Sequence, residues 1–260
     1  MTDVVLTARE GAVLRITINR PERRNAMNEE VCAGIAAGVD EAEATQGVRV
    51  IVLTGAGDKV FCAGGDLKPG ADGTPFVIDP ANPRHYVIQL FRRLERCGLP
   101  VIARVNGHAL AGGLGLVCAC DMAISTDTAT FGVPETKLGL FPMMILGYMM
   151  RIVPRRKLYE IATTGEPFSA AEALAMDIVN HVVPAAELDA KLAWLVGRIA
   201  DKSPTAIKLG KQAFRAIEDL PLDKAFEYTQ LMLPMMAMTE DAREGFAAFN
   251  EKRAPRWPGR

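Results

Sequence analysis

The chain has 260 residues, of which 49% are hydrophobic and 23% are charged, and its formal net charge at pH 7 is −1. This balance is ordinary for a globular protein, and the absence of a long basic run excludes a nucleic-acid-binding surface from the expected functions. Five cysteines without CxxC spacing fit reduced thiols, the first residues lack the apolar core of a signal peptide, and no apolar segment is long enough for a membrane span, so we expect a cytoplasmic protein.

The first half of the chain alternates predicted strands with predicted helices. Val4–Thr7 and Val13–Asn19 alternate apolar and polar residues and predict a β-hairpin, and Asn28 is a good N-cap for the helix after it. Arg49–Thr54 is apolar enough for a strand that is buried on both faces. The remaining predictions are a site-covering loop at Lys68–Pro83, helices at His85–Cys97 and Leu114–Ala119, strands at Pro100–Val105 and Asp121–Thr126, and a short strand and turn at Phe131–Glu135. Such alternation indicates an α/β fold.

The second half changes character and is mostly helical. Arg155–Thr164 and Ala170–Met176 predict helices, and Ile178–Val183 predicts a last short strand. Apolar residues from position 188 onward then follow helical spacing, and Ser203-Pro204 is a typical helix start. We therefore expect an α/β body over residues 1–200 and a helical tail over residues 201–260, whose apolar faces need either the body or a neighbouring subunit.

Two glycine-rich turns are the most informative stretches. Residues 105–115 read VNGHALAGGLG, and residues 61–66 read FCAGGD, each after a predicted strand. Glycine lets a backbone approach a ligand closely, and the first amides of a new helix are unpaired. The two turns together are therefore candidates for an oxyanion hole built from two backbone amides.

Six stretches in the same order resemble the crotonase, or enoyl-CoA hydratase/isomerase, superfamily. They are NRPERRNAM (19–27), VIVLTGAGDKVFCAGGDL (50–67), PVIARVNGHALAGGLGLVCACDMAI (100–124), FGVPETKLGL (131–140), TGEPFSAAEALAMDIVNHVVP (164–184) and EGFAAFNEKRAP (244–255). The resemblance implies an α/β spiral of repeated ββα units that binds acyl-CoA, and a C-terminal helical region that forms a homotrimer or a dimer of trimers. It implies no permanently bound cofactor and no metal, with coenzyme A entering as part of the substrate.

The resemblance also assigns roles to individual residues. The amides of Gly65 and Gly112 would hold the thioester carbonyl as it becomes an enolate, and Glu135 would move the proton. Coenzyme A would be contacted by basic residues and by backbone of the first glycine turn. The residues concerned are Arg23, Ala63, Gly65, Lys68 and Lys252.

The chain departs from the two-carboxylate hydratase pattern at Gly115, where such hydratases carry a second Glu. One-glutamate members of the family include enoyl-CoA isomerases, and certain hydratases also lack this Glu, so both hydration and double-bond isomerisation stay open, with hydration slightly favoured. If the chain is a hydratase, Gly115→Glu is expected to raise its rate. Residues 141–146, FPMMIL, replace a Gly-rich segment and either line the acyl pocket or repack a helix.

Other polar residues near the turns are interpreted as structural. Asp66 is expected to act as a turn acid that points away from the site, His108 to pack, and Cys62 to be inert. Rival functions are decarboxylation, thioester hydrolysis and a catalytically silent acyl-CoA-binding protein. A serine hydrolase is disfavoured because the sequence has no GxSxG motif.

Overall fold

The computed structural model describes residues 3–67, 80–81 and 83–260, and its largest element is a six-stranded sheet. The strand order is β1 (Val5–Glu10), β2 (Val13–Ile18), β3 (Val50–Gly55), β5 (Val101–Val105), β7 (Met122–Thr126) and β10 (His181–Val183). β1 and β2 form the predicted antiparallel hairpin, and every later pairing in this sheet is parallel. β3 is buried along its whole length, which explains its unbroken apolar run.

A second, smaller sheet gives the fold its repeat. Its strands are β4 (Val60–Cys62), β6 (His108–Leu110), β8 (Thr130–Gly132) and β9 (Phe168–Ser169), in that order. β4, β6 and β8 are parallel, and β9 closes the sheet antiparallel to β8. Three successive pairs, β3–β4, β5–β6 and β7–β8, thus give one strand to each sheet, and helices follow them. This arrangement confirms the expected spiral of ββα units.

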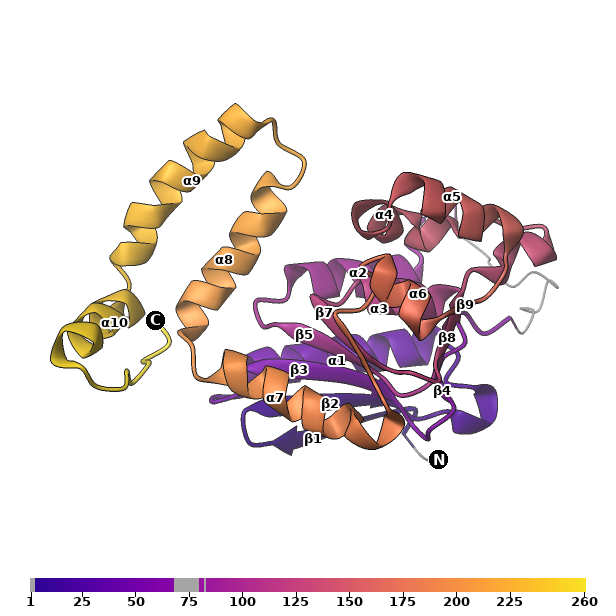
Figure 1. Cartoon of the computed structure of the whole chain (residues 1–260), viewed down its shortest axis with the longest axis horizontal. Coiled ribbons are helices and arrows are strands. Elements are labelled where there is room, and N and C mark those ends of the chain that lie inside the picture. Colours follow the sequence, from indigo (N-terminus) through magenta and orange to yellow (C-terminus); the bar gives the residue numbers. More distant parts are fainter. Residues whose placement is uncertain (1–2, 68–79, 82) are drawn as a thin grey trace.

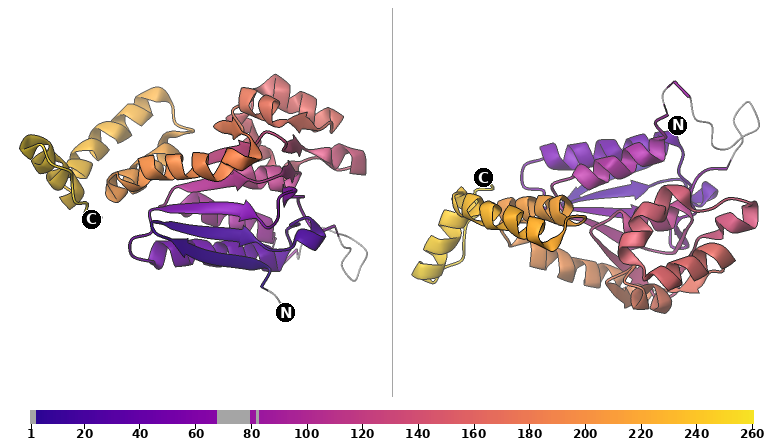
Figure 2. Two further views of the ribbon diagram at one scale, coloured as in Figure 1. Left: turned by 60° about the horizontal axis from the view of Figure 1, so that its bottom comes forward. Right: turned by 90° about the horizontal axis from the view of Figure 1, so that it is seen from above.

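Helices cover both faces of the six-stranded sheet (Figure 1). α1 (Glu29–Ala44) and α2 (Tyr86–Arg96) lie on one face and α7 (Leu188–Ala200) on the other, as Figure 2 also shows. Asn28 caps α1 as predicted, because its Oδ1 accepts the Val31 N–H at 2.9 Å. The shorter helices of the body are α3 (Gly112–Cys118), α4 (Met143–Ile152), α5 (Arg155–Thr164) and α6 (Ala170–Ala175), with 3-10 turns η1 (Pro21–Arg23), η2 (Pro134–Leu138) and η3 (Ala185–Glu187).

Three helices form a tail that extends away from the body (Figures 1 and 2): α8 (Pro204–Ile217), α9 (Leu222–Ala237) and α10 (Glu240–Glu251). Pro234 lies inside α9 without ending it. Large apolar side chains of the tail are exposed, among them Phe214, Phe226, Leu231, Leu233, Met235, Met238, Phe246 and Phe249. So much exposed apolar surface is typical of an interaction surface.

Several elements differ from the sequence prediction, among them β4, β6, β9 and α4. The second glycine turn does not follow β5 directly, because the three-residue strand β6 intervenes. α4 was not predicted, and its first four residues belong to the segment 141–146 whose role was left open. Of the predicted loop at Lys68–Pro83, residues 68–79 and 82 lie outside the described residues. Among the residues that are described, no helix is both long and apolar enough to cross a membrane.

Candidate active site

The three candidate catalytic residues follow three neighbouring strands of the smaller sheet. Gly65 comes three residues after β4, Gly112 two residues after β6, and Glu135 three residues after β8. Since β4, β6 and β8 are adjacent and parallel, their carboxyl ends lie at one edge of the sheet. The topology therefore gathers residues that are 47 and 23 positions apart in the chain (112 − 65 and 135 − 112).

The first glycine turn is braced by the segment around Met27. The Met27 N–H donates to the Gly64 carbonyl at 2.8 Å, and its carbonyl accepts the Asp66 N–H at 2.7 Å. The Arg20 guanidinium bonds the Asp66 carboxylate at 2.9 Å and the Ala26 carbonyl at 2.7 Å. Asp66 therefore supports the turn and does not line the cavity, as predicted.

Asn25 ties the same segment to the sheet. Its side chain is fully buried, with Nδ2 donating to the carbonyls of Ala56 at 3.0 Å and Val60 at 2.7 Å, and Oδ1 accepting the Arg20 N–H at 3.1 Å. Every polar atom of this amide is thus paired, which a buried polar side chain requires. The motif NRPERRNAM is therefore largely a brace for the first glycine turn.

The second glycine turn packs directly on the first. Gly64 has φ +98°, and a Cβ there would lie 2.7 Å from the Ala111 Cβ and 3.1 Å from the Gly112 nitrogen. A Cβ on Gly113 would lie 2.1 Å from the Cys62 carbonyl oxygen. Glycine at these two positions is thus a steric requirement for bringing the turns together.

Ala111 fixes the direction of the second turn. It has φ +49°, which is uncommon for alanine, and its N–H donates to the Gly132 carbonyl of β8 at 2.8 Å. Such backbone strain persists only where surrounding contacts impose it, and it gathers at functional sites. This bond links the turn that carries Gly112 to the strand that leads to Glu135.

The amides of Gly65 and Gly112 are available for a ligand. Among the described residues, neither N–H donates to a protein acceptor. An ideal Cβ on Gly112 would lie 3.6 Å from the Gly65 nitrogen, so the two turns present their amides close together. Two unpaired donors at one point suit an oxygen that gains negative charge.

Glu135 lies in η2, and its carboxyl is desolvated. The Oε2 atom is buried and has no hydrogen-bond partner in the described part of the chain. Burial raises the pKa of the Glu135 carboxyl above its ordinary value of 4.5, against a smaller lowering by its own backbone N–H. A carboxyl in this state is a stronger base and is suited to take and return a proton.

One cavity of about 320 Å³ joins these groups. Ala63, Gly65, Gly112 and Glu135 all line it, and the rest of its lining is mainly apolar. The apolar wall consists of Met27, Leu67, Val87, Ala111, Pro134, Leu138, Leu140, Phe141, Pro142, Met143, Met144 and Ile145. The segment 141–145 therefore lines the pocket, which was the first of the two roles considered for it.

Tyr86 is the one cavity-lining residue with a polar side chain, besides Glu135, among the described residues. Burial raises the pKa of its phenol, so the group stays a protonated hydrogen-bond donor. His85 holds the start of α2, because its Nδ1 accepts the Val87 N–H at 3.2 Å and its ring lies 4.2 Å from that of Tyr86. The sequence prediction missed Tyr86, since only tertiary packing brings the first turn of α2 to the pocket.

The space beside Gly115 is filled by apolar side chains. A Cβ on Gly115 would lie 2.1 Å from the Cγ2 of Ile145 and 3.4 Å from the Cζ of Phe91. Ile145 is 2% exposed and branched at Cβ, so it cannot swing away. A glutamate at position 115 would therefore require Ile145 and α4 to shift, and the expectation that Gly115→Glu raises the rate stays a prediction.

Only two of the four described residues that are predicted to contact coenzyme A line the cavity. Ala63 and Gly65 line the cavity, whereas Arg23 is exposed in η1 and Lys252 is exposed at the end of α10, in the tail. Neither Arg23 nor Lys252 lines the cavity. Lys68 lies outside the described residues. The roles of these residues remain predictions.

Other polar groups near the site are structural. The His108 Nδ1 accepts the Thr130 N–H at 3.0 Å. Burial raises the pKa of the Cys62 thiol to about 12, so it is not a thiolate at neutral pH. Within residues 3–67, 80–81 and 83–260, no group of three His, Cys, Asp or Glu side chains could hold a metal ion.

Comparison with known proteins shows similarity along the whole chain. Residues 8–260 match the family described as Enoyl-CoA hydratase/isomerase. A carnitinyl-CoA dehydratase of Escherichia coli is 34% identical over the full length of both chains. Among solved structures, an enoyl-CoA hydratase of Bacillus anthracis has a TM-score of 0.89 at 30% identity, covering 99% of this chain and 100% of that one. One from Mycobacterium smegmatis has a TM-score of 0.87 at 32% identity, covering 98% of each chain.

The raised pKa of Glu135 predicts that the difference in thermal stability between the wild type and Glu135→Gln depends on pH. A carboxyl that binds its proton more tightly in the folded state loses stability as pH rises from 4.5 through its raised value. Glu135→Gln has no proton to lose, so it should melt at a higher temperature than the wild type at pH 7. The difference in melting temperature between the two proteins should disappear below pH 4.5, and thermal unfolding at a series of pH values measures it. Glu187→Gln, at an exposed carboxyl, controls for the lost charge; a difference that did not change with pH would contradict the account.

Proposed function

The chain belongs to the enoyl-CoA hydratase/isomerase family, and from that premise we propose that it adds water to, or removes water from, an acyl-CoA thioester with Glu135 as the single acid–base residue. The observation that carries the proposal is one cavity in which two unpaired amides, of Gly65 and Gly112, accompany a desolvated carboxyl. The name of the Escherichia coli relative supports dehydration chemistry.

In the proposed mechanism, the thioester carbonyl accepts hydrogen bonds from the amides of Gly65 and Gly112. In the dehydration direction, the Glu135 carboxylate takes the α-proton, and the electron pair of that C–H bond becomes an enolate whose oxygen the amides stabilise. The β C–O bond then breaks, and Glu135 returns its proton to the departing hydroxyl, which leaves as water. Hydration runs the same steps in reverse. One preorganised donor of this kind is worth about 3–4 kcal/mol in other enzymes.

A second candidate is double-bond isomerisation, which the packing at position 115 favours. Ile145 fills the space beside Gly115, so the described pocket wall offers hydrocarbon there, and Glu135 is the one carboxyl among the described lining residues. In that reaction Glu135 would take a proton from C2 of a 3-enoyl thioester and deliver it to C4. Both reactions use the same enolate and the same single carboxyl.

Coenzyme A recognition is proposed to depend on assembly. α10 and its terminal Lys252 stand in a tail that projects from the body (Figure 1), so Lys252 can contribute to a coenzyme A site only if the tail meets another subunit. The exposed apolar side chains of α8, α9 and α10 support such an interface. We therefore propose a homotrimer or a dimer of trimers in which Arg23, Lys68 and Lys252 contact the nucleotide.

Gly112 provides a matched pair of variants for the oxyanion hole. Gly112→Pro removes the amide donor, and as the first residue of α3 it is a helix position that proline accepts. Gly112→Ala keeps the donor, and its Cβ meets the Met27 Cε, the far end of a flexible side chain, at 2.9 Å. We expect the proline variant to lose turnover by about 10²–10³ with little loss of acyl-CoA affinity. Equal activities of the two folded variants would sink the oxyanion assignment.

Turnover tests the proton-transfer role. Glu135→Gln should lower activity by roughly 10²–10⁴, the usual contribution of general acid–base catalysis. With the wild type, a 2-enoyl-CoA that loses its conjugated absorbance and gains the mass of water indicates hydration. A 3-enoyl-CoA that yields only its 2-enoyl isomer indicates isomerisation. Full activity of Glu135→Gln would refute both reactions.

Light scattering tests the assembly. The mass in solution should be a multiple of three chains, because the described part of one chain leaves the apolar tail faces exposed. A stable monomer at micromolar concentration would contradict this assembly and the role proposed for Lys252.

A further inference from the structure

α4 separates two cavities. On one side, Met143, Met144 and Ile145 line the active-site cavity of about 320 Å³. On the other side, Met144 also lines a second cavity of about 1130 Å³, together with Tyr148 and Arg151. One wall of the acyl pocket is therefore formed by α4, which is backed by a cavity over part of its outer side. Close packing over the whole of that side would make the wall rigid, and the second cavity interrupts this packing.

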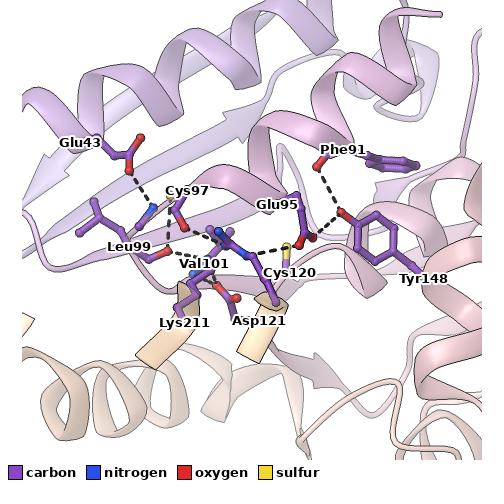
Figure 3. Close-up of polar contacts among 12 residues, drawn as sticks. Glu43, Phe91, Glu95, Cys97, Leu99, Val101, Cys120, Asp121, Tyr148 and Lys211 are labelled. Atoms are coloured by element: carbon purple, nitrogen blue, oxygen red, sulfur yellow. Dashed lines mark hydrogen bonds and ion pairs between the residues drawn. The ribbon is translucent and has the colours of Figure 1, made fainter. Parts of the chain in front are cut away.

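The second cavity lies between the body and the tail. α2 contributes Phe91 and Glu95 to its lining, and α8 contributes Lys211, Phe214 and Arg215. α8 itself is anchored to the body, because Lys211 Nζ donates to the Leu99 carbonyl at 2.8 Å and pairs with Asp121 (Figure 3). α8 is thus a fixed support on the far side of the cavity from α4.

α4 is held in place from two directions. On its inner side, Ile145 packs against Gly115 of α3. On its outer side, the Tyr148 hydroxyl lies 3.2 Å from both the Phe91 carbonyl and the Glu95 carboxylate, as Figure 3 shows. The two rings of Phe91 and Tyr148 also meet edge to face at 5.4 Å.

The outer contacts of α4 lead to the tail. Glu95 pairs with Arg215 of α8 at 3.3 Å, so the acceptor of Tyr148 is itself held by the tail. Arg151 of α4 reaches the end of α8 directly, with its Nη2 2.7 Å from Asp219 and its Nε 3.4 Å from Glu218. Tyr148 and Arg151 therefore tether the pocket wall to α2 and α8 across the cavity.

We propose that Tyr148 and Arg151 are positioning residues that set acyl-chain specificity, by fixing α4 in place against α2 and α8 and so restricting the pocket to short acyl groups. The inference rests on the proposed function, which makes the cavity an acyl-CoA site. A volume of about 320 Å³ is at the lower end of the usual range for small-molecule sites, about 300–1,000 Å³. A longer acyl chain has to push the flexible Met144 toward the second cavity and shift α4 from the position that its contacts with α2 and α8 fix.

The test measures how affinity depends on chain length, with saturated thioesters that need no turnover. Calorimetry on the full chain gives dissociation constants for butanoyl-CoA and decanoyl-CoA. Tyr148→Phe keeps the ring and removes the hydroxyl, and Arg151→Met keeps the aliphatic stem and removes the charge. Each variant should tighten decanoyl-CoA relative to butanoyl-CoA by about three- to tenfold, the range expected from one hydrogen bond. Butanoyl-CoA affinity should stay unchanged.

Controls separate positioning from general support of the fold. Arg151→Lys keeps the charge and should keep the wild-type ratio. Tyr159→Phe alters an exposed tyrosine of α5, and Arg260→Met removes a tail ion pair with Glu240 that does not touch α4; neither should change the ratio. An unchanged ratio in Tyr148→Phe and Arg151→Met, or an equal loss of both affinities, overturns this inference alone. Failure of the wild type to bind either thioester overturns the proposed function as well.

Discussion

The parallel pairing of β4, β6 and β8 is the constraint on which the site depends. Each strand has only three residues, yet their shared edge brings the ends that carry Gly65, Gly112 and Glu135 to one place. The close contact between the two glycine turns then aligns the amides, since a Cβ at Gly64 would collide with Ala111. The hydrogen bonds of Asn25 and Asp66 stabilise the first glycine turn. The Asn25 side chain is buried, and its polar atoms are paired.

The sequence was sufficient for most of the long elements and for the choice of candidate site residues, but not for α4 or for the other walls of the pocket. The strand β3 and the capped helix α1 have strong local residue patterns. The two turns can be recognised in the sequence because they are rich in glycine. β6 was not predicted because a strand of three residues is too short to show a pattern of alternating apolar and polar residues. Tyr86 was not predicted as a pocket residue because its position depends on how α2 packs. The steric conflict of a glutamate at position 115 was not foreseen, since the obstacle is Ile145, thirty positions later in the chain (145 − 115).

The character of the pocket follows from what surrounds Glu135, the one carboxyl among the described residues that line it. A mainly apolar wall leaves Glu135 desolvated, and this raises its pKa and makes it a useful proton carrier. Part of this wall belongs to α4, whose outer side contacts α2 through Tyr148 and the end of α8 through Arg151. α4 thus borders the cavity of Glu135 on one side and contacts the tail on the other, and this is the basis of the proposed link between the tail and acyl-chain specificity.

The most direct test of the account is the carbonyl stretching frequency of a bound acyl-CoA whose thioester carbon is labelled with ¹³C. If the amides of Gly65 and Gly112 both bond the carbonyl oxygen, binding must weaken the C=O bond and shift the labelled band to lower wavenumber. In Gly112→Pro, with one donor left, the shift should be smaller while the ligand remains bound. A band at the frequency of the free thioester in the wild-type complex would contradict the central claim that two glycine turns form one oxyanion hole.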